Sequence, residues 1–126
     1  MIKGIGNDII EIERVKKAAE KDSFLKKVFS EEELAYFRHK NMRAETIAGN
    51  FAAKEAVAKA MGTGFSGFEP SDVAVLRNEN GKPYVVLKGE AKEKAFSLGI
   101  NKIEVSISHC RDYASAFAVC EGDDTL

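Results

Sequence analysis

The sequence predicts an α+β domain in which a mixed, largely antiparallel sheet packs against one central helix. Three observations lead to this prediction. An alanine-rich segment over 51–61 has apolar residues at helical spacing, two strand-like segments flank an Asn-Gly turn signal within 72–87, and two apolar segments follow one another over 103–120. A chain of 126 residues, 44% of them hydrophobic, is long enough for a core of its own, so we expect a single domain over 1–126.

The N-terminal part is expected to form a short strand and then helical segments. The strand covers 2–7 and contains glycines at alternate positions, which in a strand often mark the close approach of a ligand or another backbone. Asp8 is placed at the end of this strand, before a helix whose apolar stripe runs over 12–19. A second helical segment is expected over 24–29.

A third helix and the central helix follow. Ser30 and Glu33 have the spacing of a capping box, in which each side chain bonds the other residue's backbone N–H at the start of a helix. The central helix is expected to begin near Ala44 and to end before Gly62. Glycines and a proline over 62–70 predict a loop after it.

The C-terminal half is expected to contain two hairpins separated by a short helix. Segments 72–77 and 84–87 are joined by the Asn-Gly turn, and Pro83 should lie at a strand start or edge because it cannot donate to a ladder. A helix over 91–98 precedes strands over 103–108 and 113–120. Because the last segment is apolar on both faces, we expect a central strand that is buried on both sides.

The two cysteines are not expected to form a disulfide. In the predicted C-terminal hairpin, Cys110 lies in the turn and Cys120 near the far end, more than about 20 Å away. We therefore expect two free thiols in a reducing compartment.

Composition bounds the class of partner. The chain has 19 basic and 20 acidic residues, and its net charge of −1 does not suggest a nucleic-acid partner. It has no signal-peptide pattern and no apolar run of membrane-spanning length, so we expect a cytoplasmic protein without a membrane anchor. Segment 14–43 carries nine basic and five acidic residues, which suits either an acidic partner or a charged solvent-exposed face.

Glu55 and Lys59 lie four residues apart on one face of the central helix. This spacing is typical of a solvated ion pair. It also suits an anion site, in which a carboxylate holds a hard cation and a lysine contacts the phosphate bound to that cation. The residues alone leave both interpretations open.

Other catalytic motifs are absent from the sequence. Ser108-His109 does not indicate a serine hydrolase, because consecutive strand residues face opposite sides and no Gly-x-Ser-x-Gly pattern is present. The cysteines and histidines lack zinc-site spacing, and there is no P-loop or complete dinucleotide fingerprint. The remaining candidates for a site are Asp8, Glu55, Lys59 and His109.

Four segments together resemble one protein family. They are Gly4-Ile5-Gly6-Asn7-Asp8-Ile9, Phe51-Ala52-Ala53-Lys54-Glu55-Ala56, Asn80-Gly81-Lys82-Pro83 and Ser106-Ile107-Ser108-His109. With Lys59 and Gly62, they are similar in order and spacing to the motifs of the holo-acyl-carrier-protein synthases, the small stand-alone class of 4′-phosphopantetheinyl transferases. The resemblance covers residues 2–119 and implies that family's fold.

The resemblance implies transfer of 4′-phosphopantetheine from coenzyme A to a serine of apo-acyl carrier protein, with adenosine 3′,5′-bisphosphate as the other product. It implies Asp8 and Glu55 as ligands of Mg²⁺, which prefers one or two carboxylates together with phosphate oxygens. Lys59 matches a lysine near the diphosphate of the coenzyme. The serine proton would go to Glu55 or to a metal-held water.

The resemblance also implies several binding residues. Lys54 is either a coenzyme contact or a surface charge, and Arg14 lies where the family presents a basic helix to the acidic carrier protein. Residue 50, commonly Arg in the family, is Asn50, and residue 110, often Thr, is Cys110. The remaining implied coenzyme contacts are Gly62, Gly81, Pro83 and His109, although a glycine directly after a helix, such as Gly62, more often only ends that helix.

The family assembles as homotrimers with sites between subunits, so Asp8 and Glu55 would share one subunit while Pro83 and His109 belong to its neighbour. Two alternatives stand beside this activity. A non-catalytic module that binds coenzyme A or carrier protein would not need both carboxylates. A metal-dependent phosphohydrolase would need more carboxylate or histidine ligands than the sequence offers.

Overall fold

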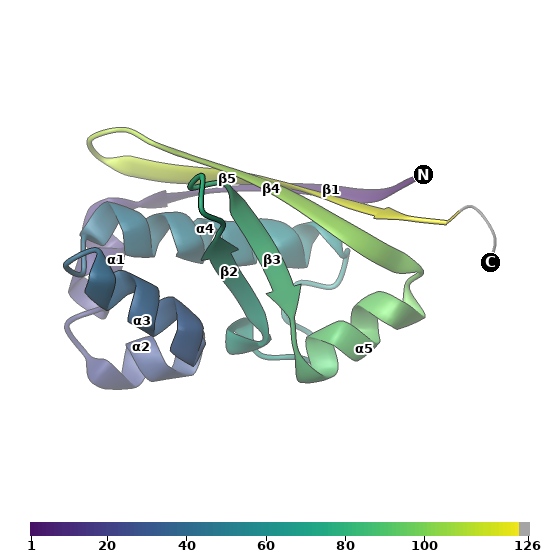
Figure 1. Cartoon of the computed structure of the whole chain (residues 1–126), viewed down its shortest axis with the longest axis horizontal. Helices are drawn as coiled ribbons and strands as arrows, with labels where there is room; N and C mark the ends of the chain where they lie inside the picture. Colours follow the sequence, from purple (N-terminus) through teal and green to yellow (C-terminus); the bar gives the residue numbers. More distant parts are fainter. Residues whose placement is uncertain (124–126) are drawn as a thin grey trace.

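The computed structural model describes residues 1–123. Figure 1 shows a long central helix lying along one face of a sheet, with small helices gathered at one end and a further helix at the other. In chain order the elements are β1 (Ile2–Glu11), α1 (Ile12–Ala18), α2 (Asp22–Val28), α3 (Glu31–His39), α4 (Ala44–Ala60), the 3₁₀ helix η1 (Pro70–Asp72), β2 (Val73–Arg77), β3 (Pro83–Leu87), α5 (Gly89–Ser97), β4 (Ile100–His109) and β5 (Tyr113–Gly122).

The predicted α+β class is confirmed, but the sheet differs from the expectation in two ways. The described strands form two sheets, a three-stranded one in the order β1-β5-β4 and the separate hairpin β2-β3. Every pair is antiparallel, so the expected mixed sheet is wrong. The physical reason is that short turns join β2 to β3 and β4 to β5, and only antiparallel strands can be joined in this way.

Strand β1 is longer than expected, and this moves Asp8. The strand continues to Glu11, and Asp8 pairs with Ala116 in its middle instead of ending it. The sequence suggested that residues 9–11 lead into a helix. They continue the strand instead, because β5, which is distant in the sequence, provides backbone hydrogen-bond partners for them. The helix that follows is correspondingly short, at seven residues.

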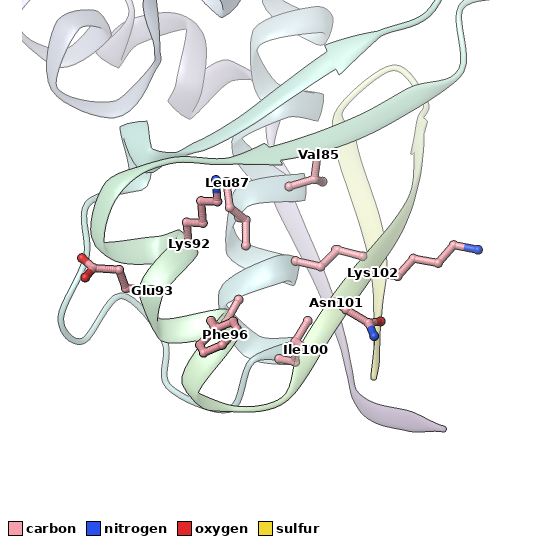
Figure 2. A pocket seen from close by; sticks show the side chains of 10 residues that line it. Val85, Leu87, Lys92, Glu93, Phe96, Ile100, Asn101 and Lys102 are labelled. Atoms are coloured by element: carbon pink, nitrogen blue, oxygen red, sulfur yellow. The ribbon is translucent and has the colours of Figure 1, made fainter. Parts of the chain in front are cut away.

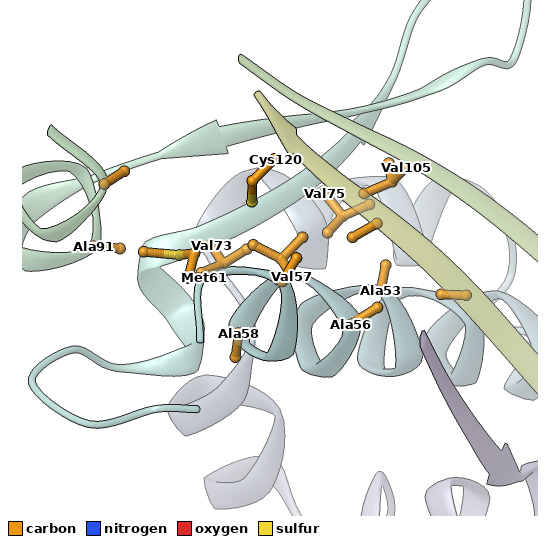
Figure 3. Packing of buried hydrophobic residues seen from close by; sticks show 14 of the residues in the cluster. Ala53, Ala56, Val57, Ala58, Met61, Val73, Val75, Ala91, Val105 and Cys120 are labelled. Carbon is orange, nitrogen blue, oxygen red and sulfur yellow. The ribbon is translucent and has the colours of Figure 1, made fainter. Parts of the chain in front are cut away.

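The core lies between α4 and the two sheets. Figure 3 shows Val57 of α4 and Met61, the residue after that helix, reaching Val73 and Val75 of β2, with Val105 of β4 above them. Ala53 and Ala56 are fully buried, so their small side chains let the sheet backbone come close to the helix. Burial of this face, together with alanine's helix propensity, accounts for the 17-residue central helix.

Strand β5 is central, as predicted, but it is buried on one face only. Its alternate residues face α4, while Tyr113 and Phe117 are 45% and 46% exposed on the outer face. Ile5 and Ile9 of neighbouring β1 are exposed beside them, at 61% and 65%. The expectation that β5 is buried on both faces is therefore wrong for the single chain, because α4 covers only one side of the sheet.

The smaller local predictions are confirmed. Ser30 and Glu33 form the full capping box at the start of α3. Gly81 has φ of 82° in the β2-β3 turn, and Pro83 is the first residue of β3. Both cysteines are free thiols, with Cys110 exposed and Cys120 buried. No helix in residues 1–123 is long and apolar enough to cross a membrane.

Lys54 is a buried structural residue, so its prediction as a surface charge is wrong. Its side chain is 1% exposed, and the ammonium donates to Glu33 at 2.6 Å and to the carbonyls of Val73 and Pro70 at 2.6 and 3.0 Å. Burial lowers the pKa of the Lys54 ammonium, while the Glu33 charge opposes that shift. Since its ammonium is enclosed by these three acceptors, Lys54 is not placed to contact a coenzyme.

Replacing Lys54 with Met should destabilise the fold, because Glu33 would keep a buried charge without its partner. We expect the free energy of unfolding to fall by about 3–5 kcal/mol in urea denaturation. The control is Lys88→Met, which removes an ion pair with Glu32 at the surface and should leave the urea midpoint nearly unchanged. Equal shifts in the two variants would contradict the role assigned to burial.

Candidate active site

Two glycines bring strand β1 directly against helix α4. A Cβ atom at Gly4 would lie 1.9 Å from the carbonyl oxygen of Ala60, and one at Gly6 would lie 2.2 Å from that of Ala56. Real atoms do not approach so closely, so only glycine allows this contact. The alternate glycines seen in the sequence therefore serve backbone–helix packing, and the next residue on the same face of β1 is Asp8.

Asp8, Glu55 and Lys59 come together at this contact. The Lys59 ammonium lies 3.2 Å from Oδ1 of Asp8 and donates to the carbonyl of Asn7 at 3.0 Å. Asp8 is 17% exposed, while Lys59 is 53% exposed. The described residues contain no ion pair between Glu55 and Lys59, so the lysine pairs with the strand and not along its own helix.

The two carboxylates influence each other. Burial is the main cause that raises the pKa of the Glu55 carboxyl above its ordinary value, the nearby Asp8 charge adds to it, and Lys59 opposes it. Two carboxylates close enough for the charge of one to raise the pKa of the other, beside one ammonium, suit a hard divalent cation, which would relieve their repulsion. Within residues 1–123, no group of three or more His, Cys, Asp or Glu residues is arranged to hold a metal.

A second group of predicted residues lines a cavity of about 420 Å³ on the β4 side of the molecule. His109, the last residue of β4, lies there together with Gly81 and Pro83 of the hairpin. The structure therefore places three residues that were predicted as coenzyme contacts around one cavity. The other lining residues are Tyr36, Glu45, Thr46, Gly49, Arg77, Ile107 and Ser108.

Arg77 is the basic residue of this cavity that sequence reasoning missed. Its guanidinium donates from Nη2 to Oδ1 of Asn50 at 2.8 Å and lies 5.3 Å from the centre of the Tyr36 ring. The only sequence signal was a basic residue at the end of a predicted strand, which is also a common surface feature. Asn50 itself is fully buried, so the expected loss of a cation at position 50 does not leave the cavity without one.

The two groups lie on different sides of α4. Asp8 on β1 and Ile107 on β4 sit at one level of the sheet with Ala116 of β5 between them, so two strand spacings, about 10 Å, separate their backbones. On the helix, Gly49 of the cavity and Glu55 are six residues apart, which places them about 120° apart around the axis.

The other predicted residues lie away from both groups. Gly62 has φ of 80° after the end of α4, and its N–H donates to the carbonyl of Lys59. This geometry fits the helix-ending interpretation, and the donor is not available to a phosphate. Arg14 is exposed on α1, beside Lys16 and Lys17 in the last turn of that helix.

A larger cavity lies elsewhere and contains none of the predicted site residues. It measures about 710 Å³, and Figure 2 shows it between β3, α5 and the start of β4, with Val85, Phe96 and Ile100 among its lining side chains. Its lining is mostly apolar. We place the candidate site at the smaller cavity and the carboxylate group because those positions hold the charged and polar groups that chemistry on phosphates needs.

Comparison with known proteins identifies the family of this fold. A family model described as the 4′-phosphopantetheinyl transferase superfamily matches residues 4–118. The chain therefore belongs to this superfamily. Within it, the chain is similar over nearly its whole length to the holo-acyl-carrier-protein synthases.

Particular relatives illustrate this similarity. The chain is 52% identical over 124 residues to the holo-acyl-carrier-protein synthase of Clostridium tetani, covering 98% of both proteins. The crystal structure of the synthase from Neisseria meningitidis matches with a TM-score of 0.89 at 31% identity, covering 96% of this chain and 99% of that one. The Helicobacter pylori synthase in complex with coenzyme A matches with a TM-score of 0.81 at 32% identity, covering 93% and 99%.

Replacing Gly6 with Ala should disrupt the contact that assembles the carboxylate group. The added methyl would meet the backbone of α4, so we expect a loss of about 3 kcal/mol or more in the free energy of unfolding, measured by urea denaturation. Asn7→Ala is the matched control, because it changes the next residue of the same strand on the exposed outer face. A Gly6→Ala protein as stable as this control would contradict the close packing.

Proposed function

We propose that this chain is a Mg²⁺-dependent holo-acyl-carrier-protein synthase. It transfers the 4′-phosphopantetheine of coenzyme A to a serine hydroxyl of apo-acyl carrier protein and releases adenosine 3′,5′-bisphosphate, in support of fatty acid biosynthesis. The observation that carries the proposal is the meeting of Asp8, Glu55 and Lys59 at the contact between β1 and α4, in a chain similar throughout to such synthases.

The residues present suit transfer of a phosphoryl-linked group. In the reaction the serine oxygen forms a bond to the β-phosphorus of coenzyme A, the bond to the leaving adenosine bisphosphate breaks, and the serine loses its proton. Asp8 and Glu55 would hold the cation, which when bound neutralises charge on the diphosphate. Lys59 brings a second positive charge to the same group, since its ammonium already lies against Asp8.

Glu55 is also suited to accept the serine proton. Burial and the Asp8 charge raise the pKa of its carboxyl when no cation is bound, and a bound cation would oppose that shift. It lies on the rigid central helix, so its position is set by the packed core and not by a loop. Glu55 would thus help to hold the cation, and either Glu55 or a water held by the cation would take the serine proton in this proposal.

The proposed assembly is a homotrimer with active sites between subunits. Two features support it. The carboxylate group and the cavity of His109 lie on different sides of α4, which suits an arrangement in which a coenzyme takes the first from one subunit and the second from its neighbour. The exposed apolar side chains on the outer sheet face, including Ile5, Ile9 and Phe117, form a surface that a second copy could bury.

The proposed protein partner is the acidic acyl carrier protein, in the cytoplasm. Arg14 is exposed on α1, and the last turn of that helix carries two further basic residues. A basic helix of this kind attracts an acidic partner by long-range electrostatics. A non-catalytic binding module would keep such a helix, but it would gain nothing from two neighbouring carboxylates, so we do not favour that function.

The proposal is tested by the intact mass of an apo-acyl carrier protein after incubation with this protein, coenzyme A and Mg²⁺. We expect a gain of about 340 Da, one phosphopantetheine arm, that disappears when EDTA is added. A carrier protein whose acceptor serine is replaced by alanine is the control and should gain nothing. No gain with the intact carrier, while coenzyme A still binds in a titration, would favour the binding module.

Glu55→Gln should lower turnover by about 100-fold or more in the same assay while leaving the urea midpoint close to that of the parent protein. The amide keeps the size of the side chain but removes its charge and its capacity to accept the proton. Glu90→Gln, an exposed change on α5, is the control and should retain full turnover. Normal turnover by Glu55→Gln would remove Glu55 from the site.

A further inference from the structure

The cavity beside His109 contains one cation whose role is not explained by packing. Arg77 ends strand β2, pairs with Pro83 of β3, and lines this cavity. It forms no ion pair with a carboxylate within 4 Å among the described residues. The Glu33 charge acts on Arg77 without a direct ion pair, so this half-buried guanidinium at the wall of a cavity is suited to bind an anion.

We propose that Arg77 binds the ribose 3′-phosphate of coenzyme A, and that Asn50 is the residue that positions its guanidinium. This inference rests on the proposed function, because it takes coenzyme A as the occupant of the cavity. It assigns a residue that none of the sequence motifs contains.

The position of the guanidinium is fixed by Asn50. The side-chain nitrogen of Asn50 donates to Oε2 of Glu33 at 3.0 Å and to the carbonyl of Val75 at 2.9 Å, which uses both of its hydrogens. The amide oxygen must therefore face Arg77, and it accepts from Nη2 at 2.8 Å. Asn50 is fully buried, so this acceptor cannot turn away.

Most donors of Arg77 remain for a ligand. The guanidinium has five N–H groups. In residues 1–123, its hydrogen bonds go only to Asn50 and, at 3.5 Å, to the carbonyl of Leu76, while the Tyr36 ring lies 5.3 Å from its central carbon. These contacts hold the group in place and leave the donors needed for a forked bond to a phosphate.

The chemistry of the ligand selects the 3′-phosphate. The diphosphate of coenzyme A belongs to the group of Asp8, Glu55 and Lys59 in the proposed reaction, so one phosphate remains. It is a monoester with a charge of about −1.5 to −2 at neutral pH and three acceptor oxygens, which matches a guanidinium. Glu45 also lines the cavity and would repel this phosphate. We therefore place the phosphate on the β2 side of the cavity, beside Arg77.

The test compares the affinities of coenzyme A and 3′-dephospho-coenzyme A, measured by calorimetry with the full chain and with Mg²⁺ present. The parent protein should bind coenzyme A about 10- to 100-fold more tightly, as expected for charge-assisted hydrogen bonds to a phosphate. In Arg77→Gln this ratio should fall below about threefold, with little change in the affinity for the dephospho form. Arg38→Gln, an exposed arginine change on α3, is the control and should keep the parent ratio.

The ratio separates contact from general damage, because a loosened fold weakens both ligands alike. An Arg77→Gln protein that keeps the parent ratio would overturn the contact. Asn50→Ala should show an intermediate ratio, and the full parent ratio there would overturn its positioning role. If the parent protein binds neither form, the proposed function fails as well; if it binds both and Arg77→Gln does not change the ratio, only this inference fails.

Discussion

The structure depends on the direct contact between the glycines of β1 and the backbone of α4. Because neither Gly4 nor Gly6 has a side chain, the strand lies closer to the helix than any other residue would allow. This distance brings Asp8 to Lys59 and places it near Glu55. The same contact packs the sheet against the alanine face of α4, so the core and the candidate metal site both depend on it.

A second constraint is the buried polar network that joins α3, α4 and β2. The Glu33 carboxylate caps α3 and accepts hydrogen bonds from Lys54 and Asn50, and Asn50 in turn accepts from Arg77. Among the described residues, no buried side-chain nitrogen or oxygen lacks a partner. A fully satisfied network of this kind is rigid. It connects the start of α3 to the Arg77 guanidinium in the cavity beside His109.

The division of the site follows from the layers of the fold. One helix under one sheet leaves the outer sheet face uncovered, and it separates the carboxylate group from the cavity of His109 and Arg77. In the proposed trimer, a second copy of the chain would pack beside the first and act on both features. The proposed trimer would thus complete the site and bury Ile5, Ile9 and Phe117 together.

Local patterns were enough to predict most of the elements: the capping box at Ser30, the alanine-rich helix, the Asn-Gly turn and the short helix before β4 depend on near neighbours in the chain. The sequence also singled out Asp8, Glu55 and Lys59 as chemistry-bearing residues. Only the tertiary structure decided that β1 continues past Asp8, that Lys54 is buried, and that Arg77 enters the cavity. Each of these depends on a partner more than fifteen residues away, and no local spacing carries that information.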